Sequence, residues 1–430
     1  MPGSKNVFLN NIRYLLVILL ILVSCSTPSE TFDLKASDND LFYADLPTRW
    51  DEGIPLGNGM LGALIWKKED KLRISLDRAD LWDLRPVAEF SRPEFKFSWV
   101  QEQVRKGDYA PVQRLFDLPF QRDPAPTKIP GGALEFNTEA LGPIREVRLY
   151  LESAVCRIDW ESGARMTVFI HATEPVGWYR FEGPHNELGL AVQPPPYGLE
   201  EKKTGQENEV SGQDLKRLNY PPPTVTADSN SIHYRQNGHG EFRFDIRVKW
   251  RSTGRERLDG VWSISADPCY GPGGSDAEKA TNEALTRSWD SDLKTHSHWW
   301  TTYWEDSSLR VPDPLLQRQW YRETYKFGSA SRRGAPPISL QAVWTADNGR
   351  IPPWKGDFHH DLNTQLSYWP CYSANHLEEG LAYLDWLWSI KETAKRFTRT
   401  YFGTNGLNVP GVTTLTGEPM GGWIQYSFSP

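Results

Sequence analysis

The chain has 430 residues, which is enough for two or three domains with large cores. Hydrophobic residues make up 39% and charged residues 24%, as in ordinary globular proteins. The net charge of −7, without a long basic stripe, argues against nucleic acid as a partner. Nineteen tryptophans are unusual, and Trp-rich chains are common among carbohydrate-active proteins, although many such rings are simply core.

The N-terminus has the pattern of an export signal. Positive charge precedes a short apolar run, Leu15 to Val23, and Leu22-Val23-Ser24-Cys25 fits a bacterial lipoprotein cleavage box. The run is shorter than a membrane span requires. We expect residues 1–25 to be a lipoprotein signal peptide, Cys25 to be lipidated and residues 26–40 to be a tether. The protein would be periplasmic or on the cell surface, held to the membrane only by its lipid. The alternatives are an uncleaved anchor helix or an ordinary signal peptide.

The remaining cysteines are Cys156, Cys269 and Cys371, with wide and irregular spacing. This pattern is not that of a disulfide framework and matches no metal-ligand spacing. We interpret them as small buried residues, with Cys371 also a candidate for a pocket wall. The sequence predicts no metal and no cofactor.

From residue 41 to residue 272, short apolar runs are separated by Gly, Asn, Asp and Pro, which is typical of an antiparallel β-sandwich. One helix is expected from Ser98 to Gly107. The segment 193–223 is rich in Pro, Glu, Lys and Gln and is expected to be an exposed insertion. The expected strands are Ala63–Trp66, Leu72–Leu76, Arg145–Leu151, Cys156–Trp160, Arg165–His171, Gly177–Phe181, Phe242–Trp250 and Gly260–Ser265.

Helical spacing replaces this pattern near Asp276, where Ser275 to Glu278 resembles an N-cap. We expect a helical linker over residues 273–310 and an all-helical domain over residues 311–430. The fold class is therefore multidomain β plus α. The expected helices of the last domain are 314–329, 363–373 and one long helix over 375–401.

The run from Trp354 to Pro370, WKGDFHHDLNTQLSYWP, combines carboxyl, imidazole and amide groups with large rings. A ring face stacks on the C–H-rich face of a pyranose, while the polar groups bind its hydroxyls. The run predicts a sugar-processing site or, alternatively, an amphipathic core helix with polar caps.

This run and the segment from Arg49 to Trp66, RWDEGIPLGNGMLGALIW, resemble glycoside hydrolase family 95. The resemblance extends from about Phe42 to Pro430. Its anchors are the Pro55-Leu56-Gly57-Asn58-Gly59 turn, itself a strong hairpin signal, and the run Asn363 to Pro370. It implies a β-sandwich followed by an (α/α)6 barrel that cleaves α-linked L-fucose or L-galactose from glycans with inversion.

The family uses a Glu as general acid, an Asp as base and an Asn-x-Asn pair that holds the attacking water. The pair aligns with Asp361-Leu362-Asn363, so the resemblance implies that Asn363 orients water or sugar. Asp361 departs from the pattern. An ionised Asp only accepts hydrogen bonds, so Asp361 is a candidate for an alternative base, a ligand of another hydroxyl, or the N-cap of the next helix.

His359 matches a sugar-binding histidine of the family; the alternative is a loop histidine bonded to backbone. Trp344, Trp354 and Trp369 are expected at the rim and floor of the pocket, with a core position as the alternative for each.

The acid and base of the family follow later in the barrel than any residue of this sequence. We therefore expect residues 311–430 to be the N-terminal part of a truncated barrel, with little or no hydrolase activity. The segment Leu76 to Trp82 also departs from an LNED-type run of the family. The competing hypothesis is a non-catalytic glycan-binding or remnant lipoprotein.

Overall fold

A computed structural model of the chain describes residues 34–184, 188–197, 210, 212–271, 276–422, 424, 425, 428 and 429. The expected signal peptide, Cys25 and most of the expected tether lie outside these residues. One compact unit begins at Ala36 and contains every element named below. Within the described ranges, no helix has the length and apolar character needed to cross a membrane.

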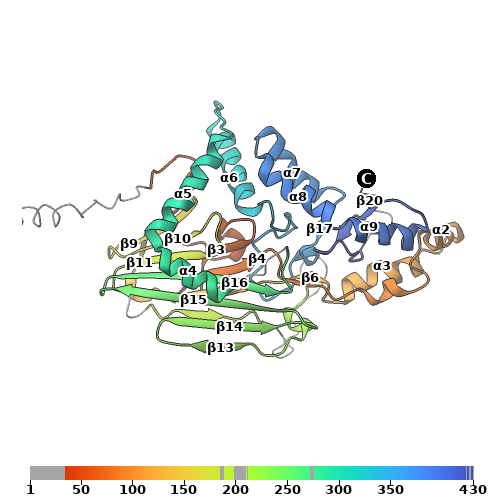
Figure 1. Ribbon diagram of the computed structural model, residues 1–430, viewed down its shortest axis with the longest axis horizontal. Coiled ribbons are helices and arrows are strands. Elements are labelled where there is room, and N and C mark those ends of the chain that lie inside the picture. The colour runs from red at the N-terminus through yellow and green to blue at the C-terminus, as the bar shows by residue number, and fades with distance from the viewer. Residues whose placement is uncertain are drawn as a thin grey trace, which may run out of the picture. The chain divides into compact units, whose positions relative to one another are not determined.

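Two antiparallel sheets form a β-sandwich (Figure 1). In the described residues the larger sheet has the strand order β1-β8-β9-β10-β11-β16-β15-β14-β13, and the smaller has the order β12-β7-β4-β3-β2. The larger sheet consists of β1 (Leu41–Tyr43), β8 (Ile144–Tyr150), β9 (Val155–Trp160), β10 (Arg165–Ile170), β11 (Gly177–Glu182), β13 (Thr224–Ala227), β14 (Ser231–Asn237), β15 (Arg243–Thr253) and β16 (Arg257–Asp267). The smaller sheet consists of β2 (Ile54–Gly57), β3 (Leu61–Lys68), β4 (Lys71–Arg78), β7 (Gly132–Asn137) and β12 (Ala191–Gln193).

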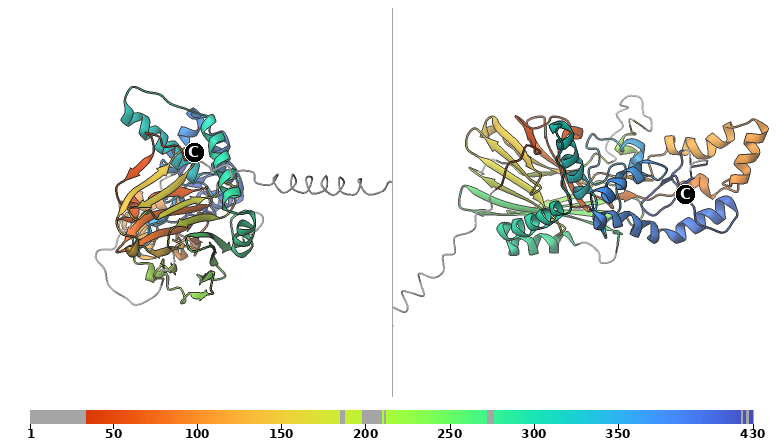
Figure 2. Two further views of the ribbon diagram at one scale, coloured as in Figure 1. Left: turned by 90° about the vertical axis from the view of Figure 1, so that its left-hand side faces the viewer. Right: turned by 90° about the horizontal axis from the view of Figure 1, so that it is seen from above.

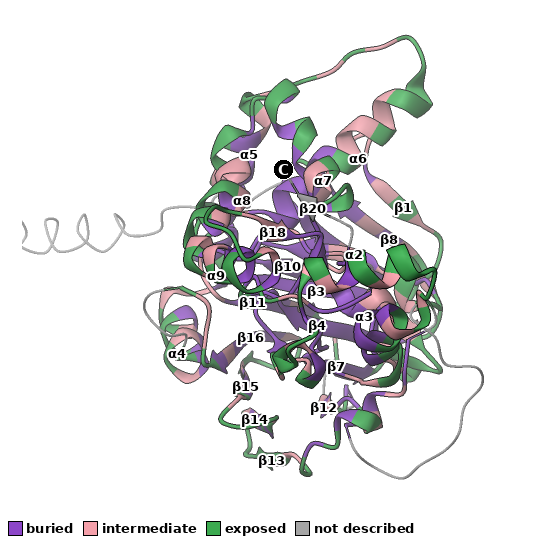
Figure 3. Cartoon of the chain, turned by 90° about the vertical axis from the view of Figure 1, so that its right-hand side faces the viewer, coloured by how far each residue is buried: buried purple, intermediate pink, exposed green. Residues whose placement is uncertain are grey.

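The sandwich core follows from period-two burial along the strands. In β15, Phe244, Ile246 and Val248 are fully buried and alternate with half-exposed residues. All strands expected from the sequence are confirmed within a few residues of their bounds. Figure 3 shows buried residues gathered on the strands of both sheets. The expectation of an exposed insertion is wrong for the described ends of 193–223, because Tyr197, Leu215, Leu218 and Tyr220 join the core.

Two helices interrupt the sandwich sequence, α2 (Phe97–Lys106) and α3 (Ala110–Arg122). The first was expected. The second was not, because Pro119 stands inside it, where proline normally breaks a helix. Figure 2 shows both helices close to the C-terminal helices, with which they share a second apolar core.

The helical part contains α4 (Ala277–Arg287), α5 (Trp289–Glu305), α6 (Pro314–Ala330), α7 (Asn363–Ser373), α8 (Leu377–Ser389) and α9 (Lys391–Phe397). Asp276 caps α4 as expected, by accepting a hydrogen bond from the Lys279 N–H. The prediction of a single linker helix is wrong, because Ser288 adopts φ +84° and separates α4 from α5. The prediction of a single helix over 375–401 is also wrong. The helical segment breaks at Ile390, and after α9 it continues as a π-helical turn, Thr398–Phe402.

The last domain is not all-helical either. β17 (Phe358–His359) pairs with β19 (Val412–Thr413), and β18 (Val409–Pro410) pairs with β20 (Phe428–Ser429). The domain boundaries at residues 272 and 310 stay predictions.

The Asn-Gly turn joins the sandwich to the helical part. The Gly59 N–H donates to the Ser329 carbonyl over 2.8 Å, and the Tyr325 hydroxyl donates to the Pro55 carbonyl over 2.7 Å. A Cβ at Gly62, directly after the turn, would lie 1.7 Å from the Val343 carbonyl oxygen. Glycine is therefore required there by close backbone packing, and the structural interpretation of this segment is confirmed.

Candidate functional site

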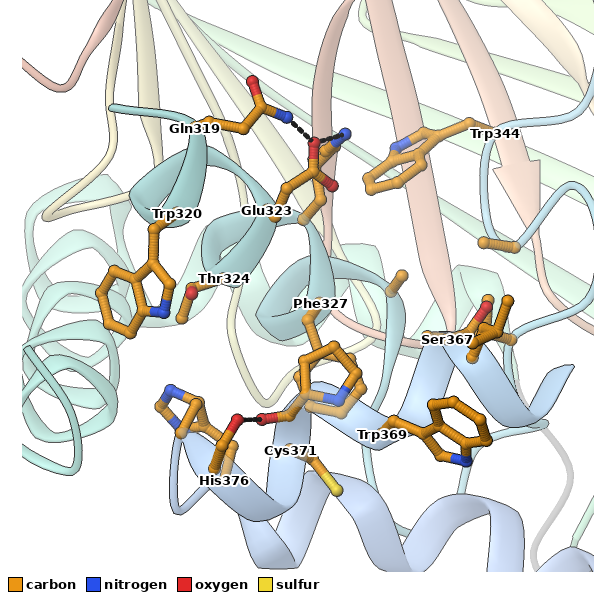
Figure 4. Close-up of a pocket in the computed structure, with 18 residues that line it drawn as sticks. Gln319, Trp320, Glu323, Thr324, Phe327, Trp344, Ser367, Trp369, Cys371 and His376 are labelled. Atoms are coloured by element: carbon orange, nitrogen blue, oxygen red, sulfur yellow. Dashed lines mark hydrogen bonds and ion pairs between the residues drawn. The ribbon is translucent and has the colours of Figure 1, made fainter. Parts of the chain in front are cut away.

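A cavity of about 720 Å³ lies between α6 and α7 (Figure 4), a volume typical of small-ligand sites. Its walls come from α6, from the loop that follows α6, from α7 and from the turn after α7. Its lining residues are Gln319, Trp320, Glu323, Thr324, Lys326, Phe327, Ala330, Ile338, Ala342, Trp344, Leu366, Ser367, Trp369, Pro370, Cys371, Ser373, Ala374 and His376.

Three tryptophans border this cavity, and two of them were predicted. Figure 4 shows Trp320, Trp344 and Trp369 around the cavity, with Phe327 among them. The Trp344 indole N–H donates to the Leu56 carbonyl over 2.9 Å, which fixes the ring against the sandwich. Trp369 remains 57% exposed, so its ring face is free to stack on a ligand.

Two polar residues of the cavity were missed from the sequence. Glu323 accepts a hydrogen bond from Gln319 and pairs with Lys326, at 2.6 and 2.7 Å. His376 is buried and its ring stacks on Tyr303 at 3.9 Å between centroids. Neither His376 nitrogen has a hydrogen-bond partner among the described residues, and burial lowers its pKa. No sequence motif singles out either residue, because each lies among ordinary helical neighbours.

A second polar group lies just before α7. The Nδ1 of His359 and a carboxylate oxygen of Asp357 form a short hydrogen bond, and both residues are buried. Burial raises the pKa of Asp357 to about 6. For His359, burial lowers the pKa, but the hydrogen bond with Asp357 and the charges of Asp357 and Asp361 outweigh it, so the pKa is raised. The pair therefore holds a proton under mildly acidic conditions.

Asp357 was not predicted as a site residue from the sequence, although its two-residue spacing from His359 is informative. Asp357 and His359 stand at alternate positions of an extended segment and so share a face, whereas Asp361 lies in the turn that follows. Phe358 lies on the other face, where it stacks on Trp82 at 5.7 Å.

Asn363 is the first residue of α7, and Asp361 precedes it by two residues; both are exposed. The interpretation of Asp361 as a helix cap is wrong, because the N-cap position is Leu362 and no side chain caps α7. Asn363 lies one turn before Leu366 and Ser367, which line the cavity, and so shares their helix face. Asn363, Asp361 and His359 do not themselves line the cavity.

Comparison with known sequences supports the resemblance to glycoside hydrolases. The sequence model "Glycosyl hydrolase family 95 catalytic domain" matches residues 287–429, and "Glycosyl hydrolase family 65, N-terminal domain" matches residues 41–255. Over its helical part the chain is therefore similar to the catalytic domain of glycoside hydrolase family 95. A segment of 45 residues is 42% identical to "Probable alpha-fucosidase A" of Aspergillus niger. That segment covers 10% of this chain and spans 5% of the length of the relative.

One predicted pocket residue lies elsewhere in the structure. Trp354 is half-buried against the second apolar core and does not line the cavity, so the core alternative holds for it. His360 is also structural: its ring bonds to Tyr383 and Thr413, and burial lowers its pKa to about 3. Cys156 and Cys371 are buried and Cys269 is half-buried; all three are free thiols, and Cys371 reaches the cavity wall.

The described part of the chain contains no group of three or more His, Cys, Asp or Glu residues that could hold a metal ion.

Proposed function

We propose that this glycoside hydrolase acts on terminal α-L-fucosyl residues of glycans by inverting hydrolysis. The α-L-galactosyl group is the second choice, since the two sugars differ only at the C6 hydroxyl. One observation supports the proposal: Trp344 and Trp369 line one cavity, and Asn363 begins the helix whose Leu366 and Ser367 also line it. The Aspergillus niger relative named above adds the sugar, although through a short segment.

Each group has a defined use in this proposal. The exposed face of Trp369 stacks on the apolar face of the sugar, while the Asn363 amide donates to and accepts from a hydroxyl or the attacking water. The protonated His359 donates to a sugar hydroxyl. Asp361, which only accepts hydrogen bonds when ionised, binds a second hydroxyl.

We further propose that the 430-residue chain alone hydrolyses slowly or not at all. Inversion needs two carboxyl groups about 6.5–9.5 Å apart, one of them free to protonate the leaving oxygen. Near Asp361, the described residues supply Asp357, which is buried and bonded to His359. Glu323, in the cavity wall, is engaged by Gln319 and Lys326.

The test is calorimetric binding of L-fucose and 2′-fucosyllactose to the whole chain, together with release of nitrophenol from p-nitrophenyl α-L-fucoside. We expect binding without measurable turnover. Trp369→Ala should weaken binding about tenfold or less, because an aromatic contact contributes about 0.5–1.5 kcal/mol. Trp388→Ala is the matched control, since Trp388 is 72% exposed on α8 and does not line the cavity. Equal affinities for all three proteins, or no binding, would refute the proposal.

The second candidate function is glycan binding without catalysis. It is favoured by Asp361, where the family pattern has an amide. Asp361→Asn restores that amide and separates the two candidates. Turnover by this variant would support the hydrolase, whereas tighter binding without turnover would support the binding protein.

The location of the protein is also a proposal. We propose export as a bacterial lipoprotein anchored through Cys25, because Leu22-Val23-Ser24-Cys25 fits a lipoprotein cleavage box. Incorporation of labelled palmitate into the wild-type chain but not into Cys25→Ala would support it. Equal labelling, or none in either, would refute it.

A further inference from the structure

A second cavity, of about 660 Å³, lies where the sandwich meets α8, α9 and the turn after β19. Its sandwich wall carries three aromatic residues, Trp82, Phe242 and Tyr270. Its opposite wall carries three hydroxyl side chains, Ser389, Thr393 and Thr416. Rings on one side and hydroxyl groups on the other match the two kinds of surface that a saccharide presents.

The two buried aspartates at this cavity are paired within the chain, whereas His239 and Glu241, which also line it, are exposed. Asp80 pairs with Arg78 at 2.6 Å and accepts a hydrogen bond from the Tyr270 N–H at 3.0 Å. Arg85 pairs with the buried Asp83 at 2.7 Å. The cavity therefore offers no unpaired buried charge to a phosphate or a carboxylate, which favours a neutral ligand.

Trp82 supplies an unused hydrogen-bond donor. Its side chain is buried, and its indole N–H has no hydrogen-bond partner among the described residues. Buried indole N–H groups usually find an acceptor, so one that lacks it calls for an explanation. A hydroxyl oxygen of a ligand in this cavity would be such an acceptor.

Trp82 also packs beside the segment that carries Asp357 and His359. Its ring stacks on Phe358 at 5.7 Å with an angle of 10° between the planes, and Phe358 directly precedes His359. Trp82 closes the segment Leu76 to Trp82, which departs from the family pattern. A ligand that contacts Trp82 would therefore act on a ring packed beside the residues of the candidate site.

We propose that this second cavity binds the neutral oligosaccharide chain that carries the terminal sugar. The inference rests on the proposed function for the identity of that sugar, but it assigns a separate site and a fucose-free ligand. The bound chain would place its hydroxyls between Thr393 and Thr416 on one side and Trp82 on the other.

The experiment uses the whole 430-residue chain and two probes: a fucosylated xyloglucan oligosaccharide and the same oligosaccharide without fucose. Ser389→Trp and Thr416→Trp place a large ring in the cavity from exposed positions, so both variants should fold. Ser291→Trp, an exposed serine on α5 outside the cavity, is the matched control. Circular dichroism confirms that each variant is folded before titration calorimetry.

We expect wild type and Ser291→Trp to bind the fucose-free oligosaccharide equally, and the two cavity variants to bind it at least tenfold more weakly. No binding to wild type, or unchanged binding to both cavity variants, would overturn the inference. A different result would refute the proposed function: Trp369→Ala would leave the preference for the fucosylated probe unchanged. That result does not depend on binding in the second cavity.

Discussion

At the residue scale, the Asp357–His359 hydrogen bond decides the charge carried at the candidate site. Replacement of Asp357 by Asn removes the charge that raises the pKa of His359, while burial, which lowers it, remains. We therefore expect the pKa of His359 to fall in Asp357→Asn. The measurement is the pH titration of the imidazole nitrogens by NMR. Asp385→Asn, an exposed aspartate on α8, is the control and should leave the titration of His359 unchanged. A His359 titration identical in both variants would contradict the argument.

Aromatic residues of the site could be predicted because they stand in or near a recognisable run. Trp369 belongs to the run from Trp354 to Pro370, Trp344 precedes it by ten residues, and both line the cavity. Trp354 stood in the same run but turns toward the second core, with φ +48°. Its direction depends on a local backbone conformation that composition does not reveal. Glu323 and His376 enter the cavity because tertiary packing brings α6 and the turn after α7 together.

A further residue-scale prediction concerns Gly62. A methyl group there would collide with the Val343 carbonyl, which belongs to backbone and cannot rotate away. We expect Gly62→Ala to lower the free energy of unfolding by several kcal/mol, about 3 or more, as overpacking against fixed backbone does in its severe cases. Urea denaturation measures it. A loss below 1 kcal/mol would show that the sandwich and the loop after α6 can separate without cost.

At the element scale, the break between α4 and α5 depends on Ser288, with φ +84° and ψ 156°. This region of backbone space is almost reserved for glycine and costs other residues about 1–3 kcal/mol. We expect Ser288→Gly to raise the free energy of unfolding by about 1 kcal/mol, since glycine loses some of that gain to unfolded-chain entropy. The control is Ser291→Gly, three residues on and inside α5, which should be destabilised by about 0.5–1 kcal/mol. If both variants change the free energy of unfolding in the same direction, Ser288 is not strained.

Strands were easier to predict from the sequence than helix ends. Alternation in β15 reports directly on burial, so its position follows from the residue pattern. The breaks at Ser288 and Ile390 carry no such signal, because neither Gly nor Pro marks them and helical spacing continues on both sides. The short pairs β17–β19 and β18–β20 were also missed, since two-residue strands depend on a distant partner.

A second prediction at this scale concerns the link between β4, β6 (Thr127–Lys128) and the loop after α6. Lys128 is fully buried and its Nζ lies 2.7 Å from Asp77, which also accepts hydrogen bonds from the Thr345 N–H and hydroxyl. Lys128→Met leaves a buried carboxylate without its cation, and we expect a loss of about 3–5 kcal/mol in unfolding free energy. Lys106→Met, from an exposed pair on α2, should leave the melting temperature nearly unchanged. Similar melting temperatures for both variants would contradict this.

At the scale of the whole molecule, buried histidines make stability depend on pH, and three of them have strongly lowered pKa values. Burial lowers the pKa of His171 to about 4, of His296 to about 3 and of His360 to about 3. His171 bonds to Thr295 and His296 to the Ser153 carbonyl, so both join the sandwich to α5. His360 lies instead in the second core.

The sign follows from proton counting. Between about pH 6.5 and pH 4, the unfolded chain protonates these histidines and the folded chain does not, so acid favours unfolding. Each contributes a loss of about 1.4 kcal/mol per pH unit in that window. Asp357 acts in the opposite direction, because its pKa is raised to about 6 and the folded chain holds its proton where the unfolded chain releases it.

The contribution of one histidine can be isolated with His360→Gln, which cannot be protonated. Although this variant loses ring stacking and is less stable at pH 7, its stability should fall less steeply with acid. We expect its slope between pH 6 and pH 4.5 to be smaller than that of wild type by about 1.4 kcal/mol per pH unit. Urea denaturation at several pH values gives both slopes.

His298→Gln, which replaces an exposed histidine on α5, is the control and should keep the wild-type slope. If His360→Gln also keeps it, His360 must be protonated in the folded chain, and the aromatic stack around it must be open to water.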